Sequence, residues 1–207
     1  HHAGCHFTPF GAPMEDDLDY GYQHRHVLAE PKRGHFGVWI RSHLEEVLVA
    51  KTHPEVLARQ HLAERLRGKD IWKRRYENIR NYHQYLAENG FVVVIIFLHT
   101  SREEQWKQLY ERVTDPRKHY KSSIKDVQER QKYWKVYQKA AEKMLSEIST
   151  EYARAYIVPA DHRWFAKMLT ARIFVKELEK LNLSYPKLTG ERRKEIKETR
   201  RLLLAEK

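Results

Sequence analysis

The chain has 207 residues and a formal net charge of +11, from 39 Lys and Arg against 28 Asp and Glu. Its five Trp and twelve Tyr exclude a disordered chain, and its longest apolar run, residues 91–98, is too short to cross a bilayer. The single cysteine, Cys5, cannot form an internal disulfide, which favours a reducing, cytoplasmic location. The excess of positive charge predicts an anionic partner: nucleic acid, acidic lipid or a phosphate-rich small molecule.

The first third of the chain predicts strands that alternate with helices. Gly11 and Pro13 close the first strand, and Pro54 opens a helix, because proline is tolerated in the first helical turn. The elements expected here are strands at residues 4–10 and 36–40 and helices at residues 15–29, at 41–51 and from 54 onward.

The segment 70–89 has the clearest helical pattern. Apolar and aromatic residues recur there at spacings of three and four, which places them on one face of a helix, and Gly90 is the expected C-terminal cap. The residues of this face are Trp72, Tyr76, Ile79, Tyr82 and Leu86.

The segment 91–99 is the clearest strand. Its unbroken apolar run predicts burial on both faces, as in a parallel sheet. Ser101 and Glu104 then match a capping box, which predicts a helix that begins there and reaches about residue 113. The remaining expected elements are a basic helix at 123–147, a strand at 155–158, and helices at 161–183 and 191–205.

Strands alternating with helices predict an α/β fold with a mainly parallel sheet between layers of helices. In such sheets ligands bind at the carboxyl ends of the strands. The segments to test for function are therefore the three that follow predicted strands: residues 41–43, 100–102 and 160–162.

Arg41 is the first candidate site residue, because it comes directly after a strand and at an expected helix start. An arginine there can meet a phosphate, aided by the helix N-terminal amides. The alternative is a structural turn in which Ser42 caps the helix.

The segment from 102 to 143 is the second candidate, with twelve Lys and Arg against seven Asp and Glu. Arg112, Lys118 and Lys121 cluster around the turn at Asp115, so two basic helices and a basic loop could close over phosphates. A solvated hairpin with ion pairs between neighbouring turns explains the charge equally well. Interleaved aromatic residues also resemble a nucleic-acid surface, although aromatics at helical spacing more often belong to a core.

Asp161 is the third candidate, since it follows the last predicted strand. It either caps the next helix or contacts a nucleotide. Other chemistries have little support: the chain has no His-Glu-x-x-His, no Gly-x-Ser-x-Gly and no phosphate loop of the type Gly-x-x-x-x-Gly-Lys-[Ser/Thr].

Five ordered motifs resemble polyphosphate kinase family 2, and the resemblance extends over nearly the whole chain to about residue 188. The motifs are GVWIRSHLEEVLVAKTHPE at 37–55, WKRRYENIRNYHQYLAENG at 72–90, FLHTSREEQ at 97–105, the DPRKHYKSS region at 115–134, and STEYARAYIVPADHRWF at 149–165.

The resemblance implies a P-loop kinase-like domain over residues 1–188, with a helical lid at about 102–145, followed by a charged C-terminal helix at 189–207. It implies phosphoryl transfer between inorganic polyphosphate and ADP/AMP or GDP/GMP, with Mg²⁺ as cofactor and a homo-oligomeric assembly without membrane or nucleic acid. Arg41 would contact the transferring phosphate, and Asp161 would lie near the nucleotide. The implied lid bases are Arg112, Lys118, Lys121 and Arg130.

The chain also departs from the family pattern. The phosphate loop would precede His1, and the position linked to the metal, usually Asp or Asn, is Ile40, which cannot bind Mg²⁺. The first lid arginine is replaced by Gln108 and an aspartate by Lys135. These departures predict a fragment or a degenerate copy; the alternatives are a non-catalytic family member that binds polyphosphate or nucleotide, and a basic nucleic-acid-binding protein.

The absent loop also bears on the sheet, because the strand before a phosphate loop is central in P-loop kinases. Without it, the strands at 36–40 and 92–99 either flank a further strand or pair with each other directly. Strands that pair lie about 4.8 Å apart, so their spacing distinguishes the two arrangements.

Overall fold

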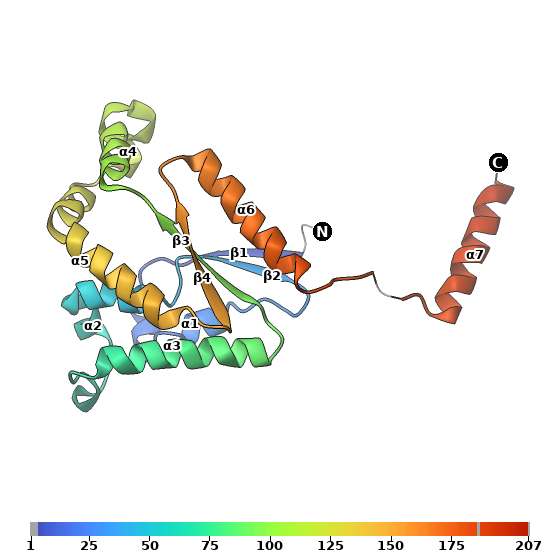
Figure 1. Cartoon of the computed structure of the whole chain (residues 1–207), viewed down its shortest axis with the longest axis horizontal. Coiled ribbons are helices and arrows are strands. Elements are labelled where there is room, and N and C mark those ends of the chain that lie inside the picture. Colours follow the sequence, from blue (N-terminus) through green and yellow to red (C-terminus); the bar gives the residue numbers. More distant parts are fainter. Residues whose placement is uncertain (1–3, 186, 207) are drawn as a thin grey trace. The chain divides into compact units, whose positions relative to one another are not determined.

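The computed structural model describes residues 4–185 and 187–206. The chain divides into two compact units, His1–Thr170 and Ala171–Lys207, and α6 begins in the first and ends in the second (Figure 1). The expected domain boundary near residue 188 stays a prediction.

In chain order the elements are β1 (Cys5–Pro9), η2 (Asp16–Asp19), α1 (His24–Val27), β2 (Phe36–Ile40), η3 (Glu46–Ala50), α2 (Pro54–Arg59), η4 (Glu64–Leu66), α3 (Ile71–Glu88), β3 (Val93–His99), α4 (Arg102–Thr114), η5 (Pro116–Lys121), α5 (Ile124–Ile148), β4 (Ala153–Pro159), α6 (Arg163–Glu179) and α7 (Gly190–Ala205).

The described strands form two parallel pairs, which confirms the expected α/β class with parallel strands flanked by helices. β1 pairs with β2, from Cys5 opposite Phe36 to Pro9 opposite Ile40. β3 pairs with β4, in a register that begins with Val93 opposite Ala153. Within the described part of the chain β2 and β3 are not hydrogen-bonded neighbours, so the alternative in which these two strands pair directly is wrong.

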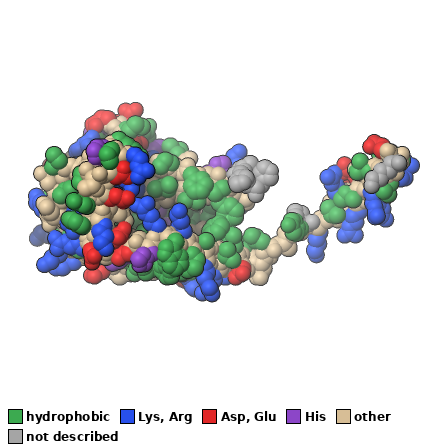
Figure 2. Space-filling view, turned by 90° about the horizontal axis from the view of Figure 1, so that it is seen from above, with side chains coloured by type: hydrophobic (Ala, Val, Ile, Leu, Met, Phe, Trp, Pro, Cys, Tyr) green, Lys and Arg blue, Asp and Glu red, His purple; other side chains and the backbone are tan. Residues whose placement is uncertain are grey.

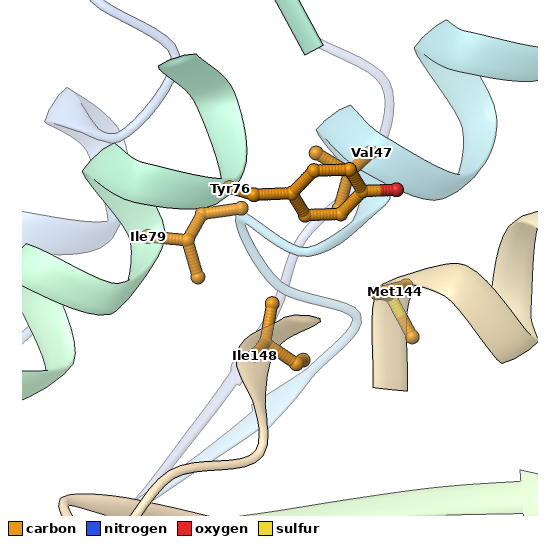
Figure 3. Packing of buried hydrophobic residues seen from close by; sticks show 5 residues of the cluster. All are labelled: Val47, Tyr76, Ile79, Met144 and Ile148. Carbon is orange, nitrogen blue, oxygen red and sulfur yellow. The ribbon is translucent and has the colours of Figure 1, made fainter. Parts of the chain in front are cut away.

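The main core lies where η3, α3 and α5 meet. Val47, Tyr76, Ile79, Met144 and Ile148 are buried together, and Figure 3 shows their side chains converging from these elements. Burial of an aliphatic side chain of this size stabilises the fold by about 1.5–3 kcal/mol. The predicted apolar face of α3 is therefore confirmed.

Helix α3 also ends as its sequence predicts. Gly90 has φ +83°, a backbone region that residues with a Cβ rarely adopt. The N–H of Gly90 donates to the carbonyl of Ala87, and the N–H of Phe91 donates to the carbonyl of Leu86. These two bonds form a Schellman motif, which satisfies carbonyls that the helix end would leave unpaired.

Strand β3 is less buried than its apolar run predicts, so the expectation of burial on both faces is wrong. Val93–Phe97 are only half-buried, and Leu98 is 56% exposed. Ile95 and Phe97 pack against the core cluster. Among the described strands β3 has a neighbour on one edge only, β4, which accounts for the remaining exposure.

The single helix expected over residues 15–29 is also wrong. The structure has the 3-10 helix η2 and the four-residue helix α1, separated by residues 20–23, which include Gly21. Glycine is unfavourable inside a helix by about 1 kcal/mol relative to alanine, which explains the break.

The predicted lid segment forms a helical hairpin, as expected. Ser101 caps α4 by accepting a hydrogen bond from the N–H of Glu104 at 3.1 Å, and Ser123 caps α5 in the same way. From Ala140 onward one face of α5 is buried, with Ala140, Ala141, Met144 and Ile148. We call the part outside the core, residues 102–136, the lid hairpin.

The second unit contains α7, which confirms the predicted C-terminal helix. Its cationic side chains are exposed, and blue side chains gather over this helix in the space-filling view (Figure 2). None of the helices in the described ranges has the length and apolar character needed to cross a membrane. The cationic residues of α7 are Arg192, Arg193, Lys194, Lys197, Arg200 and Arg201.

Candidate active site

Arg41 lies at the carboxyl end of β2 in an unusual backbone conformation. Its φ is +66°, a left-handed value that is uncommon for a residue with a side chain and that often marks functional sites. The Arg41 side chain is 60% exposed, and its Nε lies 3.7 Å from Glu45 Oε1. The strand therefore ends in a sharp turn that presents a guanidinium to solvent.

This turn corrects the helix expected over residues 41–51. A left-handed residue cannot start a right-handed helix, so regular helical structure begins only at Glu45, followed by the π-helix η3. Ser42 does not cap that helix; its hydroxyl accepts a hydrogen bond from the N–H of Leu44 at 3.3 Å. Arg41 thus lies in the turn before the helix.

A cavity of about 340 Å³ opens beside this turn. Phe10 N donates to the carbonyl of Ile40 at 3.0 Å, which holds the ends of β1 and β2 together just before the turn. Burial raises the pKa of the Glu45 carboxyl, and Arg41 opposes that rise. The lining includes two arginines, three histidines and three acidic residues: Arg25, Arg41, His24, His26, His43, Asp17, Glu45 and Glu46.

Three buried histidines lie at or next to the cavity: His26 and His43 line it, and His83 contacts His43. His26 is 1% exposed, His43 is 5% exposed and His83 is fully buried. His43 Nε2 lies 3.0 Å from His83 Nε2, so one of these nitrogens donates to the other. Burial lowers the pKa of His26 and of His83 to about 4 and lowers that of His43 well below its usual value. The rings are therefore neutral at pH 7, and the arginines supply the positive charge of the cavity.

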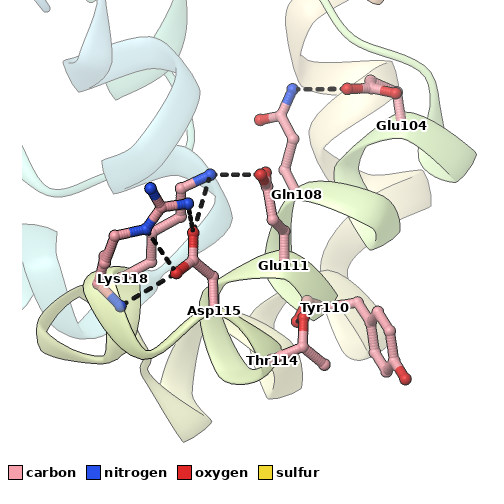
Figure 4. Close-up of polar contacts among 8 residues, drawn as sticks. Glu104, Gln108, Tyr110, Glu111, Thr114, Asp115 and Lys118 are labelled. Atoms are coloured by element: carbon pink, nitrogen blue, oxygen red, sulfur yellow. Dashed lines mark hydrogen bonds and ion pairs between the residues drawn. The ribbon is translucent and has the colours of Figure 1, made fainter.

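The lid hairpin holds the four predicted lid bases. Arg112 Nη1 lies 2.9 Å from Asp126 Oδ2, and Lys118 pairs with Glu111 and Asp115 (Figure 4). Arg112 and Lys118 therefore already have carboxylate partners within the hairpin.

The other two lid bases make different contacts. Lys121 Nζ lies 5.2 Å from the centre of the Tyr120 ring. Arg130 Nη2 donates to the carbonyl of Arg102 at 3.0 Å. The structure thus brings the lid bases together in one hairpin, while Arg41 contacts its own segment in the body.

Four aromatic residues of α4 and α5 fall into two groups. Tyr133 and Tyr137 pack on His53 of the body, with ring centres 4.6 and 5.8 Å from it. Trp106 and Tyr110 stack on each other with centres 5.0 Å apart and are half-exposed. Only the second group resembles the stacking surface of a nucleic-acid-binding protein.

Asp161 connects the ends of β3 and β4. Its Oδ1 accepts a hydrogen bond from the N–H of Ser101 at 2.7 Å, and Ala160 N donates to the carbonyl of His99 at 2.8 Å. The bond from Ser101 lowers the pKa of the Asp161 carboxyl, so this group is a carboxylate at pH 7. Asp161 thus supports the start of α4 directly; contact with a nucleotide stays a prediction.

Comparison of the sequence with protein-family models identifies the family of the chain. The model described as polyphosphate kinase 2 matches residues 1–186 of the chain. The chain belongs to the polyphosphate kinase 2 family.

Individual family members resemble the chain over most of its length. The ADP-polyphosphate phosphotransferase of Rhodopseudomonas palustris is 39% identical over 202 residues, which are 97% of this chain and 70% of that protein. The AMP/ADP-polyphosphate phosphotransferase of Meiothermus ruber is 34% identical over 89% of this chain and 64% of its own length. The crystal structure of polyphosphate kinase 2 from Arthrobacter aurescens TC1 matches with a TM-score of 0.84 and 30% identity, over 96% of this chain and 67% of that one.

Within this polyphosphate kinase 2 chain, the end of β2 does not fit the Mg²⁺ ion that the family pattern implies there. Mg²⁺ prefers oxygen ligands, and Ile40 at the end of β2 offers none. Across the described ranges, no three His, Cys, Asp or Glu side chains come together in a metal-binding arrangement.

Sequence reasoning missed two residues of the site, His26 and His83. A signal for His83 was present, because it follows Ile79 by four residues and so continues the buried face of α3. His26 carries no such signal, since the short helix that holds it was not predicted correctly.

Proposed function

We propose that the chain carries out phosphoryl transfer between inorganic polyphosphate and nucleoside mono- or diphosphates, ADP/AMP or GDP/GMP. Membership of the polyphosphate kinase 2 family supports this class of reaction. The observation that carries the proposal is Arg41, which a left-handed turn presents at the carboxyl end of β2 beside a cavity of about 340 Å³.

In this reaction the terminal phosphoanhydride bond of polyphosphate breaks and a terminal phosphate oxygen of the nucleotide bonds to the phosphorus. The polyphosphate, one unit shorter, keeps the bridging oxygen and its electron pair. Such transfer requires positioning and charge neutralisation more than covalent catalysis. We assign these tasks to Arg41, which would contact the transferring phosphoryl group, and to Arg25 on the same cavity.

The lid bases would hold the rest of the polyphosphate by exchanging partners. The pair between Arg112 and Asp126 is partly exposed, with side chains 33% and 48% accessible, and exposed pairs contribute about 0–1 kcal/mol. Phosphate oxygens form charge-assisted hydrogen bonds of the same kind as carboxylates do, so polyphosphate can compete with these weak pairs for the lid bases. Lys118 would exchange Glu111 and Asp115 for phosphate in the same way. Lys121 and Arg130, which contact the Tyr120 ring and the carbonyl of Arg102, would bind phosphate without displacing a carboxylate.

The remaining parts of the proposal follow from the resemblance. We propose that Asp161 lies near the nucleotide, that the protein works in the cytoplasm and that it forms a homo-oligomer. Mg²⁺ is the expected cofactor, but no step is assigned to it, because Ile40 and the other described residues offer it no ligand cluster.

The direct test measures ATP formed from ADP, polyphosphate and Mg²⁺ by the chain and by its Arg41→Ala variant. Loss of one charge-stabilising group at a transition state costs roughly 100-fold in rate, so we expect at least that loss for Arg41→Ala. Arg59→Ala, which removes an exposed arginine paired with Glu15 at 3.3 Å, is the matched control and should leave the rate unchanged. Equal rates for both variants would contradict the role of Arg41.

A second candidate function is binding of polyphosphate or nucleotide without turnover, and Ile40 is the observation that favours it. The Ile40 side chain is 56% exposed at the end of β2, where the family has Asp or Asn. If binding alone is the function, Ile40→Asp will not produce Mg²⁺-dependent turnover. Competition of bound polyphosphate by RNA at equal phosphate concentration would instead favour a nucleic-acid-binding protein.

A further inference from the structure

His53 is a buried histidine of the body whose side chain contacts the lid hairpin. It precedes α2 and is 6% exposed. Its Nε2 shares a hydrogen bond with the hydroxyl of Tyr137 at 2.9 Å and lies 3.0 Å from Glu129 Oε2. Its Nδ1 lies 3.1 Å from Glu55 Oε1, so both ring nitrogens face a carboxylate oxygen.

The partners of His53 lie on one face of α5, at the part of the helix that leaves the core. Glu129, Tyr133 and Tyr137 are spaced by four residues, which places them above one another on the helix. The Tyr133 ring packs edge-on against the His53 ring at 4.6 Å. The core contacts of α5 begin only at Ala140, so the contact with Glu129 lies about three turns closer to the lid tip.

The same stretch of α5 carries the rest of the lid hairpin. Arg130, the neighbour of Glu129, donates to the carbonyl of Arg102 at the start of α4. The pair between Arg112 and Asp126 joins α4 to α5 a second time. Because α4 is tied to α5 at both points, whatever fixes the first half of α5 also fixes the lid bases.

We propose that His53 is a positioning residue that anchors α5 to the body and thereby sets where the lid bases stand relative to Arg41. It does not touch the reacting groups. The role of the anchored hairpin rests on the proposed function, but the anchor itself is a property of the chain alone. Without the anchor, the hairpin must be ordered at the moment of binding, which lowers the apparent affinity for polyphosphate.

The test uses two variants. His53→Phe keeps a ring against Tyr133 and removes the three polar contacts, and His53→Gln has a side-chain amide that can still donate toward Glu129. Hydrogen exchange is followed by mass spectrometry without ligand. In His53→Phe we expect residues 116–136 to exchange about tenfold faster, the ratio that corresponds to loss of one hydrogen bond, while α3 exchanges as before. His53→Gln should restore most of the protection.

The matched control is His61→Phe, which removes an exposed histidine that lies 2.5 Å from Asp19 and is remote in sequence from the hairpin. It should change exchange in neither region. The Kd for sodium polyphosphate should rise about tenfold in His53→Phe and return toward the original value in His53→Gln.

Unchanged exchange of the hairpin in His53→Phe would overturn the proposal, and so would equal acceleration in α3, which would indicate a general loss of stability. If no form of the chain binds polyphosphate, the proposed function fails, while the exchange data still decide whether His53 anchors the hairpin.

Discussion

Two ion pairs with nearly the same length show how differently the body and the lid hairpin are held. Arg75 Nε lies 3.1 Å from Glu46 Oε1 in the body, with side chains 10% and 7% exposed. Arg112 and Asp126 lie 2.9 Å apart in the hairpin, with side chains 33% and 48% exposed. From their N–O distances alone, the two pairs would be expected to contribute equally to stability.

The two ion pairs differ in what surrounds them. Gln60 donates to Glu46 Oε2 and accepts from Arg75 Nη2, both at 2.8 Å, and the Arg75 guanidinium lies 4.2 Å from the Tyr22 ring centre. The body pair thus belongs to a buried network that cannot exchange partners without unfolding. The pair between Arg112 and Asp126 is exposed to solvent, so a phosphate can replace the carboxylate of Asp126. The body fixes Arg41, and the hairpin can rearrange around a ligand.

The largest expected effect comes from breaking the buried pair. Arg75→Ala leaves Glu46 as an uncompensated buried acid, which should lower the free energy of unfolding by about 3–5 kcal/mol. Arg112→Ala, the control in the hairpin, should cost about 1 kcal/mol or less. Urea unfolding followed by circular dichroism measures both, and similar losses would remove the distinction between the two regions.

Two isoleucines of α5 test the same contrast without charges. Ile148 is fully buried in the core and Ile124 is 79% exposed in the hairpin. Ile148→Ala should cost about 2–5 kcal/mol through the cavity that it leaves. Ile124→Ala should change stability by about 0.5 kcal/mol or less, and a larger loss there would mean that the hairpin is packed as tightly as the body.

The buried histidines predict a pH dependence of the body. Between pH 6.5 and about 4 the unfolded chain binds protons that His26 and His83 exclude in the folded state, because burial lowers their pKa to about 4. The free energy of unfolding should therefore fall as the pH falls through this range, by up to about 1.4 kcal/mol per pH unit for each histidine. Above pH 6.5 these groups should have no effect.

The matched measurement is the same titration with His83→Gln, which removes one titrating group from the cluster. Its unfolding free energy should depend less steeply on pH between 6.5 and 4. An unchanged slope would assign the pH dependence to other groups.

The smallest expected effect concerns the caps of the hairpin. Ser101→Ala removes the side chain that accepts from Glu104 N–H and should weaken α4 by about 1 kcal/mol. Faster amide exchange in the first turn of α4, with α3 unchanged, is the expected result. Loss of protection across the whole chain would show that the hairpin and the body unfold together.

Local rules predicted the elements whose signals lie within a few residues. The apolar face of α3 with its glycine end, the strand at Phe36–Ile40 and the serine caps of α4 and α5 all formed as expected. Each depends on helical or strand periodicity and on one capping residue, which a sequence displays directly.

Features that depend on tertiary neighbours could not be predicted in the same way. The left-handed turn at Arg41 could not be predicted, because the residue in that conformation is not a glycine. The exposure of β3 depends on which strands flank it and not on its own apolar run. Similarly, the charges at Lys118 and Arg112 predict a basic hairpin, but their carboxylate partners become known only from the folded chain.

The most direct test of the account is hydrogen exchange of the chain with and without sodium polyphosphate. We predict that residues 102–136 exchange more slowly when polyphosphate is bound, because all four lid bases then bind phosphate, Arg112 and Lys118 in place of their carboxylate partners, while α3 is unaffected. Binding of polyphosphate with no change in residues 102–136 would contradict it.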